Sequence, residues 1–376
     1  MSITAGLVVT TIFDPVVLEG YFRNFEQYGH LDDVDIYVIP DRKTPAQAYE
    51  RCLDLSRRGL KVTCPTLEEQ KAFLDRVDFS ANLIPFNSDN RRNVGYLMAL
   101  DSGSDFIISI DDDNYCRPEE DFFLEHAVVC QQSHMAEIVN TATGWFNICS
   151  LLTFDGASIS YPRGFPYYAR HKQEQPDVTN RQCDVEINAG LWLMNPDVDA
   201  ISWLVNPARA ESFSGRCLVL GERAWSPINT QNTALRRDVV AAYYYVKMKY
   251  ALTGMVIDRY GDIFSGYFAQ ACVRHLGGSI RIGTPIVDHK RNSHNYLDDA
   301  VNELAGIILL EDLLPWLIEA RLDGNTYHEV YQSLSYALEE AVEKFQGKIW
   351  NDATRGYFHQ MSYCMREWVK ACKLIG

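Results

Sequence analysis

Short apolar runs alternate with stretches of helical periodicity through the first third of the chain. The apolar runs cover residues 6–13, 34–39 and 106–110. Between them, apolar positions recur at three- and four-residue spacing over residues 16–25, 45–60 and 93–100. The short runs are typical of buried strands and the periodic stretches of amphipathic helices. Asp14 and Pro15 stand where an N-cap and first turn would begin the first helix. Strands and helices in alternation predict βαβ units and a mostly parallel sheet.

The remainder of the chain divides into an irregular middle and a helical end. Residues 140–243 are richer in glycine, proline and aromatic residues, which predicts mixed strands and long loops. Beyond Tyr296 one apolar face recurs at helical spacing, formed by Val330, Leu334, Ala337, Leu338, Ala341 and Phe345. We therefore expect an α/β domain over residues 1–296, with a mixed sheet flanked by helices, and a helical extension over residues 297–376 packed on it.

The charge balance excludes several classes of partner. The 376 residues include 35 Lys and Arg against 50 Asp and Glu, a formal net charge of −15. Such a surface repels phosphate backbones and anionic lipids, so no nucleic acid is expected as a partner. A small phosphorylated ligand stays compatible, because a metal ion or a few arginines can reverse the field within one cleft.

Membrane and secretion signals are equally weak in the sequence. We expect no membrane span, because no run approaches the roughly 18 apolar residues that one requires. The first residues lack the basic and apolar regions of a signal peptide. Ten cysteines occur without a Cys-x-x-Cys pair, a pattern typical of reduced thiols in a cytoplasmic protein.

Three consecutive acids, Asp111, Asp112 and Asp113, follow the apolar run that ends at Ile110. Carboxylates this close repel one another unless a cation compensates them. Side chains alternate along a strand, so Asp111 and Asp113 are expected to point to one side and bind one ion. Open oxygen sites suit Mg²⁺ or Mn²⁺, which also bind diphosphate oxygens. A solvated acidic turn is the alternative, since the acidic segment 118–120 follows, but the position is that of the Asp-x-Asp motif of GT-A glycosyltransferases.

Six segments resemble, in the same order, motifs of the reversibly glycosylated polypeptides, the plant UDP-arabinopyranose mutases. They are residues 92–96, 109–115, 163–170, 190–193, 259–262 and 283–289. The similarity continues weakly to Trp368 and implies a GT-A-like, Rossmann-like fold and a UDP-sugar as substrate. Two departures stand out: Gly261 replaces the first acid of a paired-acid motif, and residues 230–232 replace a Gly-Met-Asn segment. Both lie in the half expected to shape the sugar or acceptor site.

The resemblance implies roles for the acidic segment and its surroundings. Asp111 and Asp113 are expected to bind the metal, and Asp112 the ribose or sugar hydroxyls. His289 follows an apolar run and matches a histidine of the family, so its neutral imidazole is expected to complete the coordination. Arg92 precedes a predicted helix and is expected to neutralise diphosphate charge as a bidentate donor.

Residues after the first two apolar runs, and one tryptophan, are the candidates for contact with the nucleoside. Asp41 is expected to hydrogen-bond the uracil or ribose, and Thr10 to contact the base, with Thr11 beside it. Trp192 is a candidate for stacking on the sugar or uracil, as is Trp225. Core packing is the alternative for both rings in a chain that is 12% aromatic.

The resemblance also implies that Arg163 carries the sugar covalently. Arginine is a poor nucleophile, because its guanidinium has a pKa of ~12.5 or higher and stays protonated. In the alternative, electrostatic role, Arg163 and Arg170 clamp the departing diphosphate and stabilise its growing charge. Asp262 is expected to act as a general base or to hold sugar hydroxyls, unless it only caps the following helix.

These residues together predict a metal-dependent UDP-sugar enzyme. In a mutase, cleavage of the UDP–sugar bond lets a pyranose contract to a furanose that UDP then recaptures. In a glycosyltransferase, the sugar passes to a hydroxyl or amine of an external acceptor. A non-catalytic nucleotide-sugar-binding subunit is the third reading, because the resembling family implies hetero-oligomers; homo-oligomers are equally compatible with the sequence.

Overall fold

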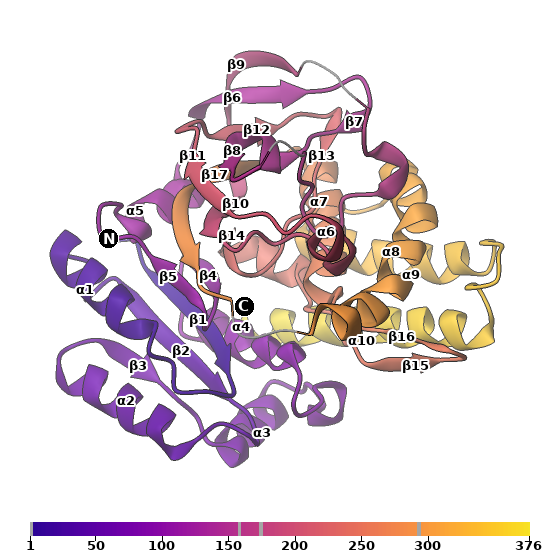
Figure 1. Ribbon diagram of the computed structural model, residues 1–376. Coiled ribbons are helices and arrows are strands. Elements are labelled where there is room, and N and C mark those ends of the chain that lie inside the picture. The colour runs from indigo at the N-terminus through magenta and orange to yellow at the C-terminus, as the bar shows by residue number, and fades with distance from the viewer. Residues whose placement is uncertain (1–2, 157–158, 173–175, 292–294) are drawn as a thin grey trace.

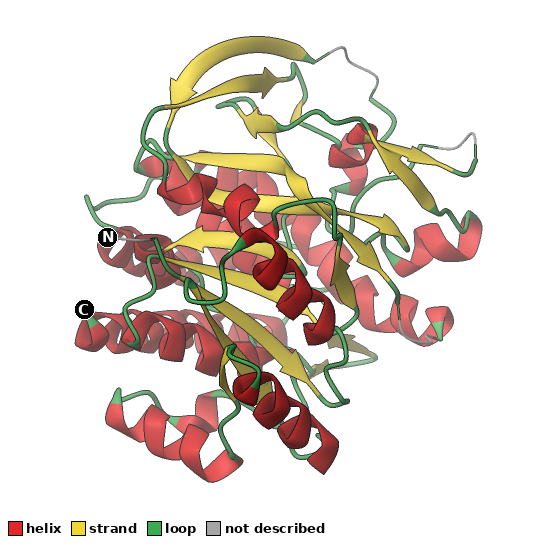
Figure 2. Ribbon diagram, turned by 90° about the vertical axis from the view of Figure 1, so that its left-hand side faces the viewer, coloured by secondary structure: helices red, strands yellow, loops and turns green. Residues whose placement is uncertain are grey.

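The computed structural model describes residues 3–156, 159–172, 176–291 and 295–376, which are built around one large mixed sheet. Its principal path, in the described residues, is β3-β2-β1-β4-β14-β10-β17-β12-β6-β9. In Figure 1 this path runs from β3 at the lower left to β9 at the top. Helices cover both faces of the sheet (Figure 2). Five of the nine pairings along the path are parallel, so the predicted mostly parallel mixed α/β sheet is confirmed.

The N-terminal third forms the βαβ units that the sequence predicts. Its elements are β1 (Ala5–Thr11), α1 (Leu18–Tyr28), β2 (Val34–Pro40), α2 (Ala46–Arg57), β3 (Lys61–Thr63), α3 (Leu67–Arg76), α4 (Arg92–Asp101) and β4 (Phe106–Asp111). The order β3-β2-β1-β4 is that of a Rossmann-like half-sheet. The first helix starts at Leu18 with Val17 as N-cap, so the prediction that Asp14 caps it is wrong. The Asp14 carboxylate instead receives a bidentate ion pair from Arg51 of α2.

Residues 114–289, which include the irregular middle at 140–243, supply the second half of the sheet and the loops around it. Its elements are β5 (Asn114–Cys116), α5 (Phe122–His126), β6 (His134–Asn140), β7 (Gly144–Trp145), β8 (Leu152–Phe154), β9 (Asp177–Cys183), β10 (Val185–Met194), α6 (Ala200–Val205), β11 (Ala210–Phe213), β12 (Leu218–Leu220), β13 (Ala224–Trp225), β14 (Asn232–Arg236), β15 (Tyr250–Leu252), β16 (Met255–Ile257), α7 (Gly261–His275) and β17 (Ser279–His289). Within residues 140–243, the mixture of mostly short strands and long loops agrees with the predicted weak periodicity.

The strand directions bring several strand ends to one edge of the sheet. Strands β2, β1 and β4 are parallel. Strand β14 is antiparallel to both β4 and β10, and β10 is parallel to β17. The carboxyl ends of β2, β1, β4, β10 and β17 therefore meet at the same edge, in that spatial order. Ligands of open α/β sheets bind at such an edge.

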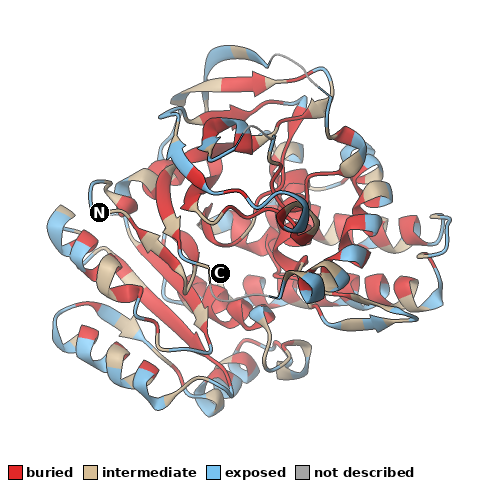
Figure 3. Ribbon diagram, viewed as in Figure 1, coloured by how far each residue is buried: buried red, intermediate tan, exposed pale blue. Residues whose placement is uncertain are grey.

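The helical C-terminal region packs against the sheet's helical layer. It consists of α8 (Tyr296–Glu319), α9 (Tyr327–Val342) and α10 (Asp352–Ile375), the orange and yellow helices of Figure 1. Trp368 of α10 is fully buried, and its indole Nε1 donates to the Val240 carbonyl at 2.8 Å. Figure 3 shows the buried faces of these helices turned toward the central strands. None of the helices in the described residues combines the length and apolar character that crossing a membrane requires.

Candidate active site

A cleft of about 400 Å³ opens at the shared carboxyl edge of the sheet. Its described lining contains seven aspartates and seven lysine or arginine residues, in addition to His289. The cleft is thus formally neutral although the chain carries −15. A divalent cation would make it positive, and the cleft would then attract a diphosphate.

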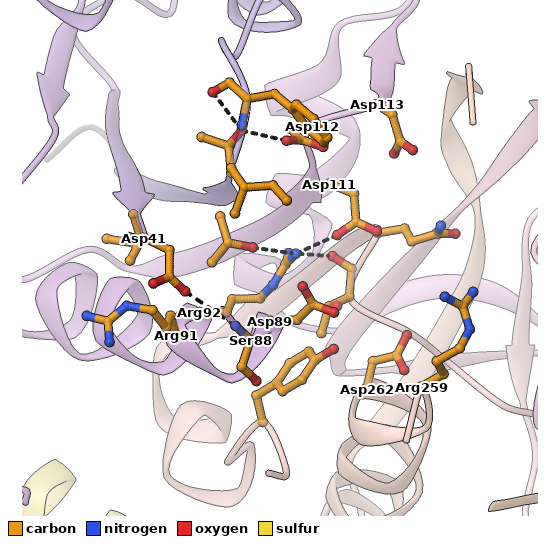
Figure 4. A pocket seen from close by; sticks show the side chains of 18 of the residues that line it. Asp41, Ser88, Asp89, Arg91, Arg92, Asp111, Asp112, Asp113, Arg259 and Asp262 are labelled. Atoms are coloured by element: carbon orange, nitrogen blue, oxygen red, sulfur yellow. Dashed lines mark hydrogen bonds and ion pairs between the residues drawn. The ribbon is translucent and has the colours of Figure 1, made fainter. Parts of the chain in front are cut away.

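Asp111 ends β4 and forms an ion pair with Arg92 of α4 (Figure 4). The guanidinium of Arg92 is buried beneath the strand end, where Nη1 donates to the Ser109 hydroxyl and the Ile110 carbonyl at 2.6 and 2.8 Å. Burial raises the pKa of the Asp111 carboxyl to about 6, although the Arg92 charge opposes this rise. Arg92 lines the cleft as predicted, but protein acceptors already take both of its terminal nitrogens.

Asp112 turns toward β1 and accepts a hydrogen bond of 2.5 Å from the Thr11 hydroxyl. Burial raises the pKa of its carboxyl to about 6, while the Thr11 hydrogen bond acts in the opposite direction. Burial is the main cause of both raised pKa values, and the nearby Asp113 charge adds to each. Asp112 lines the cleft, where a ligand hydroxyl can reach it.

Asp113 lies beside His289, with 3.5 Å between Oδ2 and Nε2. The backbone explains the contact, because the chain turns after Asp113 and β5 pairs antiparallel with the end of β17, Asn114 opposite His289. The Lys290 amide donates to the Asp113 carbonyl at 2.9 Å, and His289 Nδ1 donates to the Asn195 carbonyl at 2.7 Å. Burial alone would lower the pKa of the His289 imidazole, but Asp113 raises it above the ordinary value.

The side chains present fit an Mg²⁺ or Mn²⁺ ion that would be held partly by the protein and partly by a bound diphosphate. Within the described residues no three His, Cys, Asp or Glu side chains come together as a complete metal cage. Asp113 and His289 supply one oxygen and one nitrogen, while Asp111 is already paired with Arg92. Mg²⁺ commonly binds one or two protein carboxylates and takes its other ligands from water and phosphates. Of the three predicted metal ligands, Asp113 and His289 therefore lie together as a pair, and Asp111 lies beside this pair.

Arg163 lines the cleft and is held between two carboxylates. Its Nε and Nη2 donate to Asp197 at 2.9 and 3.2 Å, and its Nη1 and Nη2 donate to Asp262 at 3.1 and 2.7 Å. Nη1 also donates to the Arg259 carbonyl, so every N–H of the guanidinium has an acceptor. Burial opposes the charge, but the two carboxylates raise the Arg163 pKa well above its ordinary value.

The predicted nucleoside contacts lie at the β2 and β1 end of the same cleft. Asp41 accepts hydrogen bonds from the amides of Arg42 and Ser88 at 2.6 and 3.3 Å, which fixes its carboxylate at the cleft wall (Figure 4). The Thr10 hydroxyl accepts from Arg92 Nη2 at 3.2 Å. The structure thus brings Thr10 and Asp41 into one cleft with the acidic segment.

Three of the candidate residues, Arg170, Trp192 and Trp225, lie outside this cleft's lining. Arg170 pairs with Asp199 and stacks on the Tyr167 ring, 3.8 Å from its centroid, so it acts in packing rather than as a diphosphate clamp. Trp192 is 2% exposed in the middle of the hydrophobic core. This burial agrees with core packing, the alternative for this ring, because β10 is buried along nearly its whole length.

Several cleft residues escaped the sequence prediction. Asp197 follows β10 just as Asp41 follows β2, and a polar residue after an apolar run was the available signal. Arg291 lies two residues after the end of β17, so the same signal was available for it. Asp89 and Lys249 also line the cleft, but neither follows the end of a strand. Asp89 and Asp262 lie on the side of the cleft opposite Asp112 in Figure 4.

The glycine at position 261 has a structural cause. An added Cβ there would come within 2.6 Å of the Val246 carbonyl and 2.8 Å of the Tyr245 ring. The segment that contains these two residues therefore occupies the space that a side chain would need. Asp262, the acid that remains, lies in the first turn of α7 and contacts Arg163.

Comparison with known proteins places these motifs in a family. The reversibly glycosylated polypeptide family matches residues 68–376. UDP-arabinopyranose mutase 1 of Arabidopsis thaliana is 25% identical over 296 residues, 77% of this chain and 74% of that protein. Probable UDP-arabinopyranose mutase 4 of Arabidopsis thaliana is 26% identical over 295 residues, 77% of this chain and 73% of that protein. The crystal structure of glucosyl-3-phosphoglycerate synthase from Mycobacterium tuberculosis with Mn²⁺ and UDP-glucose is 9% identical, covers 82% of this chain and 79% of its own, and has a TM-score of 0.39. Because the family match covers most of the sequence, this chain belongs to the reversibly glycosylated polypeptide family.

Proposed function

We propose that the chain is a divalent-metal-dependent UDP-sugar mutase that interconverts pyranose and furanose forms of a nucleotide sugar. The observation that carries the proposal is the contact between Asp113 and His289 in the cleft that also contains Arg163, Asp197 and Asp262. Family membership supports the reaction class, since the related plant proteins are named UDP-arabinopyranose mutases.

In this proposal Asp113 and His289 hold Mn²⁺ or Mg²⁺, with Asp111 beside them. When bound, the ion neutralises diphosphate charge and stabilises UDP as a leaving group. Asp112 binds ribose or sugar hydroxyls, and Asp41 and Thr10 bind the nucleoside at the opposite end of the cleft. The order of the strand ends supports this direction, because β2 and β1 lie on one side of β4, and β10 and β17 on the other.

The buried ion-pair cluster supports a positioning role for Arg163. Its pKa is raised and its N–H groups are all engaged, so the guanidinium stays charged and lacks a lone pair for attack on the sugar. Arg163 holds Asp197 and Asp262, both of which line the cleft. Their carboxylates hold sugar hydroxyls and stabilise positive charge at the anomeric carbon after the bond to UDP breaks.

The test is incubation of the protein with Mn²⁺ and UDP-arabinopyranose, UDP-galactose or UDP-glucose, followed by chromatography of the nucleotide sugars. A furanose isomer with no net release of UDP supports the mutase. Free UDP that rises only when an acceptor is added supports a transferase. Retained UDP binding without product from any of the three sugars supports a non-catalytic binding subunit.

A glycosyltransferase is the second candidate, favoured by the departures at the cleft. Gly261 takes the place of a family acid, and its surroundings leave no room for a side chain. Gln231, in the second departing segment, lines the cleft directly. Both changes alter the region in which the sugar or its acceptor would bind, while the nucleotide end keeps its acidic segment.

A further inference from the structure

The three arginines predicted to bind diphosphate are already occupied by protein groups. One of them, Arg170, pairs with Asp199 and lies outside the cleft lining. Arg163 uses all its N–H groups on Asp197, Asp262 and the Arg259 carbonyl. Arg92 directs both terminal nitrogens to acceptors around β4. A diphosphate in this cleft therefore requires another cation as its direct donor.

Arg291 is the cleft cation with the weakest partner among those that are buried. Its side chain is 8% exposed, and its ion pair with Asp299 is 3.8 Å long, beyond hydrogen-bond distance. Asp299 also pairs with Arg259, at the shorter distance of 3.1 Å. Nη1 of Arg291 is buried without an acceptor in the part of the chain that the structure describes. A buried guanidinium N–H in this condition is stabilised by an incoming anionic oxygen.

The position of Arg291 matches the phosphate end of the cleft. It lies two residues after His289, at the β17 end of the sheet edge, whereas Asp41 lies at the β2 end. Its guanidinium lies near the stacked rings of Tyr296 and Trp203, 5.4 and 5.9 Å from their centroids. The side chain lines the same cleft as Asp113 and Arg163. A nucleotide with its base near Asp41 and its phosphates near Asp113 would extend its terminal phosphate toward Arg291.

We infer that Arg291 is the residue that binds the β-phosphate of the nucleoside diphosphate and so distinguishes UDP from UMP. The inference rests on the proposed function and adds to it the donor for the leaving group. Arg291 exchanges its long contact with Asp299 for a charge-assisted hydrogen bond to the phosphate. The guanidinium remains charged throughout, and no covalent bond forms at this residue.

The experiment compares UDP and UMP binding by titration calorimetry in the presence of Mn²⁺. Arg291→Gln is expected to weaken UDP binding by about 10- to 100-fold while UMP affinity changes by less than about twofold. Arg291→Lys keeps the positive charge but lacks the bidentate guanidinium, and its loss of UDP affinity is expected to be smaller. Lys43→Gln removes one positive charge from the same cleft next to Asp41, so it should leave the ratio of UDP to UMP affinity unchanged.

The outcomes separate this inference from the proposed function. If the wild type binds UDP and both Arg291 variants keep the wild-type ratio of UDP to UMP affinity, the role of Arg291 is overturned. The proposed function is then left intact. Absence of binding of either nucleotide by the wild type overturns both. Thermal melting of each variant identifies any that fails to fold. If Arg291→Gln does not fold, Arg291→Lys is compared with the wild type instead.

Discussion

Arg163 and Asp262 contact each other at 2.7 Å between Nη2 and Oδ2, although they are 99 residues apart in the sequence. With Asp197 on its other side, the guanidinium joins the segment between β8 and β9 to the first turn of α7 and to the segment that follows β10. The three side chains carry one negative charge in total. Negative charge at this place suits a sugar that becomes positive as its bond to the diphosphate breaks.

Arg163→Lys is expected to lower turnover by about 10²-fold while UDP affinity stays within about threefold of the wild type. A lysine has no fork to bridge two carboxylates, so Asp197 and Asp262 lose their fixed positions without loss of a nucleotide contact. The measurements are kcat in the mutase assay and UDP affinity by calorimetry. Arg170→Lys is the matched control, because Arg170 is also ion-paired and buried but lies outside the cleft.

The stability of this variant must be measured in parallel. Removal of one partner from a buried ion pair costs about 3–5 kcal/mol when the other charge is left unpaired, and Arg163→Ala would leave two. Arg163→Lys keeps a positive charge between the two carboxylates, so its loss of stability is expected to be smaller. Complete loss of UDP binding by a folded Arg163→Lys protein would contradict the positioning role.

Asp113→Asn is expected to abolish the part of UDP binding that depends on Mn²⁺. The amide keeps the shape of the carboxylate but removes the charge that a hard cation requires. UDP affinity measured with Mn²⁺ and again with a chelator gives the metal-dependent increment for each variant. Asp112→Asn is the control, since Asp112 bonds Thr11 instead and should lower affinity without removing the increment. An unchanged increment in Asp113→Asn would count against this metal site.

The sequence predicted those cleft residues that stand at the end of a buried strand. Asp41, Thr10 and Asp111 each come at the end of a buried apolar strand, and parallel strands place such ends at one edge. His289 was found through its family position, and the pairing of β5 with β17 that brings it to Asp113 has no signal in hydrophobic periodicity. Arg170 was misplaced because a family motif gives the residue type but not the direction of the side chain.

Gly261→Asp, which restores the acid of the family motif, is expected to destabilise the protein and to add no activity. The new Cβ would overlap the Val246 carbonyl and the Tyr245 ring, and overpacking of this kind costs about 1–3 kcal/mol. Urea unfolding gives the change in the free energy of unfolding. Gly156→Asp is the matched control, because none of the described residues, its chain neighbours aside, lies within 4 Å of an added Cβ at position 156. Equal stability of the two variants would refute the steric explanation of this departure.

The last prediction concerns His126, which is fully buried between Asn232 and Asn188. Asn188 Nδ2 donates to His126 Nδ1 at 3.0 Å, and Nε2 donates to Asn232 Oδ1 at 2.9 Å. This arrangement requires the neutral imidazole. Burial, with the Arg281 charge assisting, lowers the His126 pKa to about 3.

The stabilising effect of neutral His126 is therefore present above the unfolded-state pKa of about 6.5 and is lost as the pH falls toward 3. Between those values the unfolded chain binds a proton that the folded chain does not, which costs roughly 1.4 kcal/mol of unfolding free energy per pH unit. His126→Gln has no such proton, so the stability difference between wild type and variant should shrink steadily from pH 7 to pH 4.5 in urea unfolding. A difference that stays constant over this range would mean that the folded protein accepts the proton at His126. The hydrogen bonds of His126 with Asn188 and Asn232 would then have to rearrange to accommodate an imidazolium charge.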